Sequence, residues 1–335
     1  MDQDRETLYE NLTEKNFLQF YNSFDSVNEL IEFFRSRKRA NVQSFLIQSE
    51  DRSEISAVIP TKSIESKFAK ILLKKLHGMN IIFVESEGPL FNFSYSMNLG
   101  IREAIRMKSK FIMLSNDDIF PLNSIQKLQD EVIANSEKYD IFIPTVFSGR
   151  EYLSPKQNIY AQSWLTKRII YNRLVSLINP SGMHKSPRRL VTKLEIYNDP
   201  NVLKYIIIRE NDSIFRKYQS VLNTNMIEHI VRKLNMPLVE INNVQPISII
   251  KTDLLKSENF DESFVNGGED TDLSIRLAIK GAKVHNLKEQ FQNVGGHSLG
   301  QNVDRILKNT IPEILIMGYK LNQYFNQGKI LPSCL

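Results

Sequence analysis

Two adjacent carboxylates follow a strongly apolar stretch of the sequence, where they could hold a divalent cation. Residues 111–115 read FIMLS and are followed directly by Asn116, Asp117 and Asp118. A short apolar run of this kind favours a buried strand, so both carboxyl groups are expected at a strand end. Oxygen ligands suit Mg²⁺ or Mn²⁺, which proteins commonly bind through one or two carboxylates together with substrate phosphates. Turn formation and helix capping would also explain these residues.

A second acidic pair, Glu269 and Asp270, follows two glycines at the start of a helical pattern. The helix dipole and the free N–H groups of a first turn favour ionised carboxylates, and a general base must be ionised. Gly267 and Gly268 would leave room for a substrate to approach. Helix capping is the competing interpretation, and Asp272 is expected to be a solvated acid or a support to the site.

One histidine has surroundings that suit a ligand. His297 lies in the segment GGHSLG, 27 positions after Asp270. A neutral imidazole could complete a mixed oxygen and nitrogen shell around a divalent ion. A single histidine also commonly has a purely structural role, and this alternative stays open.

The segments that would position these residues alternate between strand and helix. In chain order the pattern predicts strands at 54–60, 80–85, 111–115 and 140–147, separated by helices at 64–76, 95–107 and 124–138. Such alternation implies a parallel sheet with helices on both faces, which binds ligands outside the C-terminal ends of its strands. Those ends are Pro60 and Thr61, residues 85–88, and residues 116–118.

Composition excludes several classes of protein. The chain has 335 residues, and 43 Lys and Arg against 38 Asp and Glu give a net charge of +5, too small to indicate a nucleic-acid binder. The chain has a single cysteine, Cys334, which excludes an intramolecular disulfide and a cysteine-based zinc site. This cysteine content is typical of proteins from a reducing compartment. No apolar run approaches the ~20 residues of a membrane span, and the N-terminus is acidic, so we expect a cytoplasmic protein.

A basic segment interrupts the alternation. Residues 152–194 contain eight Lys or Arg and no acid, and Trp164 stands at the edge of an amphipathic pattern. A basic amphipathic helix over residues 163–193 could lie on the anionic inner face of a membrane as a peripheral contact. It would then present a lipid-linked phosphate acceptor to the site. A solvated basic face is the plainer alternative, and an anionic glycan or nucleic-acid acceptor is a third.

Together these segments resemble family 2 of the inverting nucleotide-sugar glycosyltransferases, which have the GT-A fold. The resemblance covers residues 54–150 and 240–300. It is carried by AVIPTK in the opening strand, NFSYSMNLGIREA in a helix, NDD at the aspartates and GEDTDLSIRL at the second acidic pair. It implies an α/β fold with a GT-A-like, mostly parallel sheet flanked by helices.

The expected organisation has five parts. They are a helical segment at 1–53, the nucleotide-sugar-binding half of the domain at 54–150, the basic insertion at 151–238, the acceptor and catalytic-base half at 239–300, and a C-terminal helix and tail at 301–335. In the first part, apolar residues at offsets 0, 3, 4 and 7 predict amphipathic helices starting at Phe17 and Val27.

The resemblance also implies roles for single residues. Asp118 and His297 would bind Mn²⁺ or Mg²⁺, and Asp117 would contact the ribose or the metal. Asp270 would be the catalytic base, oriented by Glu269, which could instead contact the donor sugar. The remaining residues implied to contact the nucleotide sugar are Pro60, Thr61, Glu85, Asn98 and Asn116.

The resemblance implies a metal-dependent, inverting glycosyltransferase that moves a sugar from a nucleotide diphosphate sugar to an acceptor hydroxyl or lipid phosphate. The acceptor would be a glycan, a protein or a lipid-linked molecule. Two positions depart from the family pattern: Glu85 and Ser86 replace an aspartate-containing turn, and Met97 replaces an arginine. A catalytically silent glycan-binding or assembly module of the same fold and a sugar nucleotidyltransferase are the alternatives.

Overall fold

The computed structural model describes residues 2–13, 15–21, 23–50, 53–88, 90–148, 151–153, 156–160, 238–242, 244, 247–294 and 306–326. The chain divides into two compact units, which we treat separately. The sheet unit comprises Lys38–Gln157 and Ile241–Gly300, and the helical unit comprises Met1–Arg37, Asn158–Glu240 and Gln301–Leu335.

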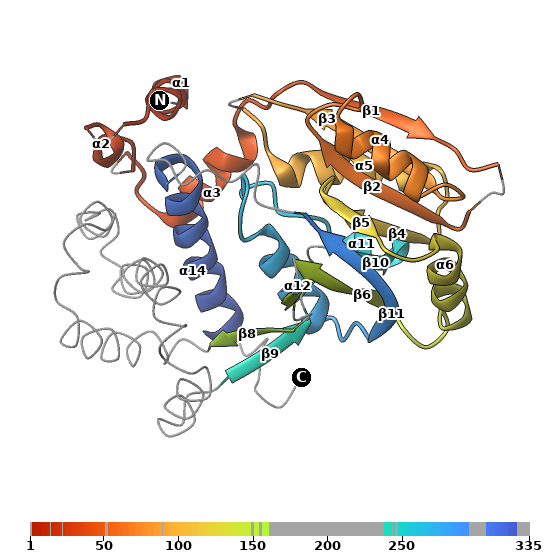
Figure 1. Cartoon of the computed structure of the whole chain (residues 1–335). Helices are drawn as coiled ribbons and strands as arrows, with labels where there is room; N and C mark the ends of the chain where they lie inside the picture. The colour runs from red at the N-terminus through yellow and green to blue at the C-terminus, as the bar shows by residue number, and fades with distance from the viewer. Residues whose placement is uncertain are drawn as a thin grey trace. The chain divides into compact units, whose positions relative to one another are not determined.

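A nine-stranded sheet forms the centre of the sheet unit (Figure 1). Its strand order is β1-β3-β2-β4-β10-β6-β11-β5, and β7 pairs with β6. The strands are β1 (Val42–Ile47), β2 (Ile55–Thr61), β3 (Asn80–Ser86), β4 (Phe111–Ser115), β5 (Ile119–Pro121), β6 (Ile141–Ser148), β7 (Glu151–Leu153), β10 (Ile247–Lys251) and β11 (Val284–Asn293). Strands β8 (Lys156–Tyr160) and β9 (Leu238–Asn242) pair as a separate ribbon.

The sheet is mixed, which corrects the expectation of a mostly parallel sheet. Strand β2 pairs in parallel with β3 and with β4, and β6 pairs in parallel with β11. Strand β10 lies antiparallel between β4 and β6, while β1, β5 and β7 are antiparallel to their neighbours. An apolar run predicts a strand but not whether the strand pairs in parallel or antiparallel, because its direction in the sheet is set by pairing with distant segments.

Successive side chains of the central strands enter two cores, one on each face. Helices α4 (Lys67–Lys75) and α6 (Ile125–Ala134) cover the face that carries Ala57, Ile59 and Phe83. Helices α5 (Phe93–Arg106), α11 (Thr252–Ser257) and α12 (Glu269–Ile279) cover the face that carries Val58, Val84 and Leu114. Because these strands are buried on both sides, they read as continuous apolar runs.

Local signals explain where the helices begin and end. The side chains of Ser66, Asn92 and Ser124 each accept a hydrogen bond from a backbone N–H in the first turn of α4, α5 and α6, as N-caps do. Gly281, two residues after α12, has a φ of 73°, which glycine adopts without strain. The helices predicted over 64–76, 95–107 and 124–138 are confirmed with bounds shifted by a few residues.

The helical unit contains α1 (Asp2–Glu10), α2 (Phe17–Tyr21), α3 (Val27–Ser36), the π-helix η2 (Ile306–Thr310) and α14 (Ile311–Asn326). Its first three helices share an aromatic core that includes Tyr9, Phe20 and Phe34. The hydroxyl of Tyr9 donates to the carbonyl of Lys308 at 2.8 Å, so the aromatic core also holds η2. The helices predicted from the apolar offsets and at the C-terminal end are present.

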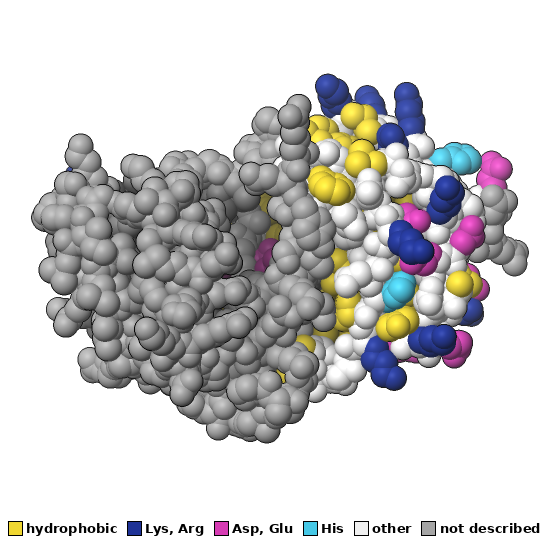
Figure 2. Space-filling model, turned by 60° about the horizontal axis from the view of Figure 1, so that its bottom comes forward, with side chains coloured by type: hydrophobic (Ala, Val, Ile, Leu, Met, Phe, Trp, Pro, Cys, Tyr) yellow, Lys and Arg dark blue, Asp and Glu magenta, His cyan; other side chains and the backbone are white. Residues whose placement is uncertain are grey.

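Two sequence predictions need comment. Residues 42–47 lie in the segment expected to be helical, but they form the edge strand β1, whose backbone pairs antiparallel with β3. The basic segment 163–193 lies outside the described residues. Among the residues that are described, no helix is long and apolar enough to cross a membrane. On the face shown in Figure 2, basic and acidic side chains of the described residues are intermixed.

Gly100 allows α5 to approach the sheet closely. A methyl group placed on its Cα would lie 2.3 Å from Cγ1 of Val58 and 2.9 Å from Cγ2 of Val84, both shorter than real contacts. The helix that precedes the first acidic site is therefore set at a distance from β2 and β3 that only glycine permits.

Gly100→Ala should destabilise the protein by about 1–3 kcal/mol, because the added methyl must displace packed valines or the helix itself. The measurement is the free energy of unfolding in urea. Arg102→Ala, at an exposed position of the same helix, serves as the control and should change stability by less than about 0.5 kcal/mol. Equal stability of wild type and Gly100→Ala would contradict the close packing.

Candidate functional site

The carboxyl ends of β2, β3 and β4 meet at one edge of the sheet, because these strands are parallel. Thr61 is the last residue of β2, and its Oγ1 donates a hydrogen bond to Oδ2 of Asp117 at 2.8 Å. Asp117 follows β4 by two residues. The contact joins two segments that the sequence placed at strand ends, and it brings the predicted residues Thr61 and Asp117 together.

Asp117 carries its charge in a partly dehydrated position. Burial raises the pKa of its carboxyl group, and the neighbouring charge of Asp118 raises it further, while the hydrogen bond from Thr61 lowers it. The net shift is upward. Two adjacent carboxylates with this electrostatic penalty are suited to a site where a positive charge is bound.

The end of β11 lies beside the aspartates. The backbone N–H of Val294 donates to the carbonyl oxygen of Asp118 at 2.9 Å, and Asn293 is the register partner of Ile119. His297 follows three positions later but lies outside the described residues. Val294, the residue that directly precedes the segment GGHSLG, is therefore hydrogen-bonded to Asp118.

The donor set suits a hard divalent cation. Asp117 and Asp118 are carboxylates, and the buried Oδ1 of Asn116 accepts no hydrogen bond from the described residues. Oxygen donors of this kind fit Mg²⁺ or Mn²⁺. Within the described part of the chain, however, no three His, Cys, Asp or Glu side chains gather in a way that could hold a metal. These residues would therefore supply part of a coordination shell.

Glu85 lies one strand further along the same edge. It is the register partner of Thr61 across the β2–β3 pair. Its Oε2 accepts the backbone N–H of Ile64 at 2.9 Å, which ties the loop after β2 to β3. Pro60 is buried inside β2, next to Val84 of β3 in the ladder.

The second acidic pair begins α12. Gly268 is the N-cap residue with a φ of 85°, and Gly267 has a φ of 147°. Backbone conformation therefore explains both glycines, in addition to the open space expected from the sequence. Glu269 is buried, and its Oε2 accepts the N–H of Gly267, whereas Asp270 is half-buried.

The second pair lies at the same edge as the first. The N–H of Phe93, at the start of α5, donates to the carbonyl of Val265 at 2.8 Å, and α5 follows the carboxyl end of β3. Val265 precedes Glu269 by four residues. At its other end α12 leads into β11, whose first residue Val284 pairs with Ile141 at the start of β6. The helix therefore runs from the carboxyl edge to the amino edge.

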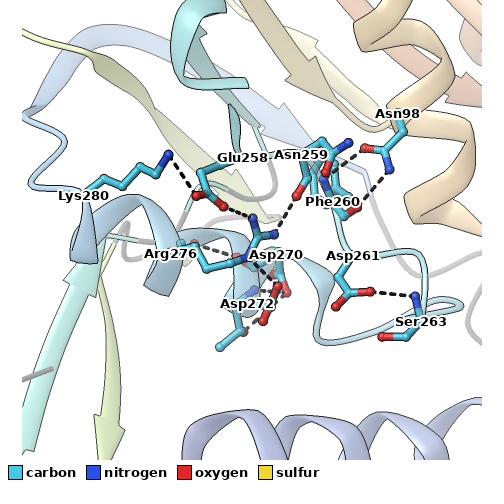
Figure 3. A network of polar contacts seen from close by, with 12 residues as sticks. Asn98, Glu258, Asn259, Phe260, Asp261, Ser263, Asp270, Asp272, Arg276 and Lys280 are labelled. Atoms are coloured by element: carbon cyan, nitrogen blue, oxygen red, sulfur yellow. Dashed lines mark hydrogen bonds and ion pairs between the residues drawn. The ribbon is translucent and has the colours of Figure 1, made fainter. Parts of the chain in front are cut away.

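An ion-pair network holds the first turn of α12 (Figure 3). Nε of Arg276 donates to Oδ2 of the fully buried Asp272 at 2.8 Å, and the guanidinium also contacts Glu258 and the carbonyl of Asn259. Lys280 contacts the other oxygen of Glu258 at 3.0 Å. Asp272 is therefore a buried support and not a solvated acid. The i,i+4 spacing of Asp272 and Arg276 is the sequence signal for this pair.

Asn98 connects this network to α5. Its amide donates to the carbonyl of Phe260, and its Oδ1 accepts the N–H of Phe260 (Figure 3). The amide also donates to Oε1 of Glu262 at 2.9 Å. The described contacts give Asn98 a positioning role for the loop before the second acidic pair. Met97, which replaces an arginine of the family pattern, is fully buried in the core.

Comparisons with known proteins do not establish a family. No family model matches the sequence, and no curated protein matches it. A crystal structure of S. aureus TarS, residues 1–349, aligns with a TM-score of 0.37 and 11% identity over 71% of this chain and 59% of that one. Protein A197 from STIV aligns with a TM-score of 0.23 and 15% identity over 32% of this chain and 52% of that one. At such TM-scores neither likeness supports an argument about fold or activity.

The ion pairs of Glu258 make the stability of this region depend on pH. Burial works to raise the pKa of Glu258, but hydrogen bonds and charges from Lys280 and Arg276 outweigh it and hold the pKa below the usual 4.5. A carboxyl group whose pKa is lowered by folding stabilises the native state above its unfolded pKa, and this contribution is lost as the pH falls through the folded pKa.

Glu258→Gln should therefore lower the free energy of unfolding at pH 7. The difference from the wild type should become progressively smaller as the pH falls below about 4.5. The measurement is urea unfolding of both proteins at a series of pH values. Glu137→Gln, at an exposed position, is the matched control and should show no such dependence. A stability difference that does not change with pH would contradict the assignment.

Proposed function

We propose that the chain is a metal-dependent, inverting glycosyltransferase that transfers a sugar from a nucleotide diphosphate sugar to an acceptor hydroxyl or lipid phosphate. The observation that carries the proposal is the presence of two acidic pairs at one edge of the sheet. One pair is held at a strand end through Thr61, and the other begins a helix. Their order along the chain is also the one that the resemblance to family 2 implies.

The two pairs suit two different tasks. Asp117 and Asp118 are adjacent and partly buried, and they follow Asn116, whose Oδ1 has no hydrogen-bond partner among the described residues. This group of oxygens favours binding of a cation. Asp270 lies at the start of α12, where the helix dipole and the free N–H groups of the first turn favour the ionised carboxylate. An ionised carboxylate near the acceptor could take the proton of an attacking hydroxyl.

A divalent cation held by Asp118, with Asp117 and His297 as further candidates, would supply charge stabilisation for the departing nucleoside diphosphate. The other tasks fall to the chain itself. Asp270 would accept the proton as the acceptor oxygen forms its bond to the anomeric carbon. Attack on the side opposite to the leaving group inverts the configuration, and one base is then sufficient.

The surrounding contacts support these roles by limiting movement. Glu269 is anchored to Gly267, and Asp272 is held by Arg276, so the turn that carries Asp270 is fixed on both sides. The hydrogen bond from Thr61 orients Asp117. Catalytic groups held in this way avoid the cost of ordering during the reaction.

Asp118→Asn and Asp270→Asn should separate binding from chemistry. The assay is release of nucleoside diphosphate from a panel of UDP and GDP sugars in the presence of Mn²⁺, together with calorimetric binding of UDP and GDP with Mn²⁺. Asp118→Asn should lose both Mn²⁺-dependent binding and turnover. Asp270→Asn should bind the nucleotide normally but lose roughly 10²–10⁴-fold in turnover, the usual contribution of a general base.

The matched control is Asp253→Asn, which changes an exposed first-turn aspartate of α11 that pairs with Lys256. It should leave both readouts unchanged. Full turnover in both Asp118→Asn and Asp270→Asn would overturn the assigned roles. Absence of any nucleotide binding or turnover in the wild type would favour a non-catalytic module.

A further inference from the structure

Strand β1 forms an unprotected edge of the large sheet. It is the first strand of the sheet order, and no other described element pairs with its outer side (Figure 1). Residues 41–49, which contain β1, read NVQSFLIQS and include no charged residue, proline or glycine. Edge strands usually carry charges or proline, because their free backbone N–H and C=O groups otherwise pair with another chain. The β1 edge lacks this protection.

The strand at the other end of the sheet order is protected. Strand β5 is only three residues long and ends at Pro121, which has no backbone N–H to donate. Strand β1 has six residues and two exposed apolar side chains, Leu46 at 47% and Ile47 at 38% of full exposure. In the β1–β3 register these two side chains lie on opposite faces of the sheet. Apolar surface is therefore exposed on both sides of the β1 edge, where a further strand would cover it.

The charges that flank β1 indicate which strand fits the edge. Lys38 precedes β1 and Glu50 follows it, and both side chains are exposed and belong to the sheet unit. Parallel pairing of two copies of β1 would bring like charges together. Antiparallel pairing brings Lys38 of each copy towards Glu50 of the other, so that opposite charges meet at both ends of the strand pair. The β1 edge is therefore complementary in charge to a second copy of itself.

Backbone geometry restricts how two identical strands can pair. In an antiparallel pair, residues whose N–H and C=O groups point towards the other strand face one another, and such residues alternate along each strand. Symmetric pairing therefore places one residue on the two-fold axis. With Ser44 on this axis, Lys38 of one copy faces Glu50 of the other. Leu46 then covers the half-buried Val42 of the other copy, and the small side chain of Ser44 leaves room for its symmetry mate.

We propose that the chain forms a two-fold symmetric dimer through antiparallel pairing of β1 with β1 of a second copy, with Ser44 on the axis. The sheets of the two subunits then continue into one another across the interface. Each chain offers one such edge, so the assembly closes at two copies and does not grow into a fibre. The interface is a single pair of short strands, and small interfaces are typical of reversible association. This inference does not depend on the proposed function.

Sedimentation equilibrium of the full chain over about 1–100 μM tests the dimer. We expect the apparent mass to rise with concentration from 38.9 kDa towards twice that value. Ser44→Lys should weaken dimerisation by roughly ten-fold or more, because two lysines would face each other on the axis. The matched control is Ile133→Lys, which introduces the same charge at an exposed position of α6 and should leave dimerisation unchanged.

The flanking charges test the register. Lys38→Glu and Glu50→Lys should each weaken dimerisation by roughly three-fold or more, since each creates two pairs of like charges in the symmetric dimer. The double variant Lys38→Glu/Glu50→Lys exchanges the two charges and should restore dimerisation to the level of the wild type. Because both residues are exposed, the variants should fold, and thermal unfolding of each one checks this.

A disulfide measures the register directly. In a chain with Cys334→Ser, Ser44→Cys should form a disulfide-linked dimer under mild oxidation. Residues paired directly across antiparallel strands have Cα atoms about 4.5–5.5 Å apart, which is within disulfide range. Gln48→Cys, at an exposed position just after β1, is the control. It should not cross-link, because its symmetry mate would lie about 27 Å away along the strands.

Four results would overturn the proposal. A wild-type chain that stays monomeric up to about 100 μM would leave the β1 edge to a different protein or to another segment of this chain. A dimer that Ser44→Lys does not weaken would use a different surface. Failure of the double charge variant to recover, or cross-linking of Gln48→Cys as fast as that of Ser44→Cys, would contradict the register.

Discussion

The parallel pairing of β2 with β3 and with β4 is the constraint on which the rest of the structure depends. It places the residues that follow these strands at one edge, where Thr61 bonds to Asp117 and Glu85 is the register partner of Thr61. The strands themselves are buried on both faces, so this edge is fixed by the cores beneath it. Side chains at the strand tips can then be polar, or carry an electrostatic penalty as Asp117 does, without loss of the fold.

The second acidic pair reaches the same edge by a different physical route. No strand carries it there. Instead, the loop before α12 is hydrogen-bonded to the start of α5 through Phe93 and Asn98, and the first turn is held by the Asp272–Arg276 pair. Burial of Asp272 is tolerated because the guanidinium compensates its charge. Helix α5 is itself held close to the sheet by Gly100, so the position of Asp270 depends on packing far from its own carboxylate.

Much of this arrangement could be predicted from local patterns. Apolar runs and helical periodicity located the central strands and their helices, because those signals lie within a few positions of the residues that they describe. The strand-end position of Asp117 and the helix-start position of Asp270 were also predicted in this way. The mixed direction of the sheet was not, since β10 is antiparallel only because it pairs with β4 and β6. Strand β1 was not predicted either, because its conformation depends on pairing with β3. The burial of Asp272 was also not predicted.

The sequence by itself therefore determined the central strands β2, β3, β4 and β6, the helices that cover them, and which carboxylates stand at element ends. Only the tertiary structure decided that Thr61 meets Asp117, that Asn98 holds the loop before α12, and that Gln43 lines up with Glu85. The reason is that hydrophobic periodicity and capping act over a few residues. Strand order and register join segments tens to more than a hundred positions apart, and they become defined only when the whole sheet is assembled.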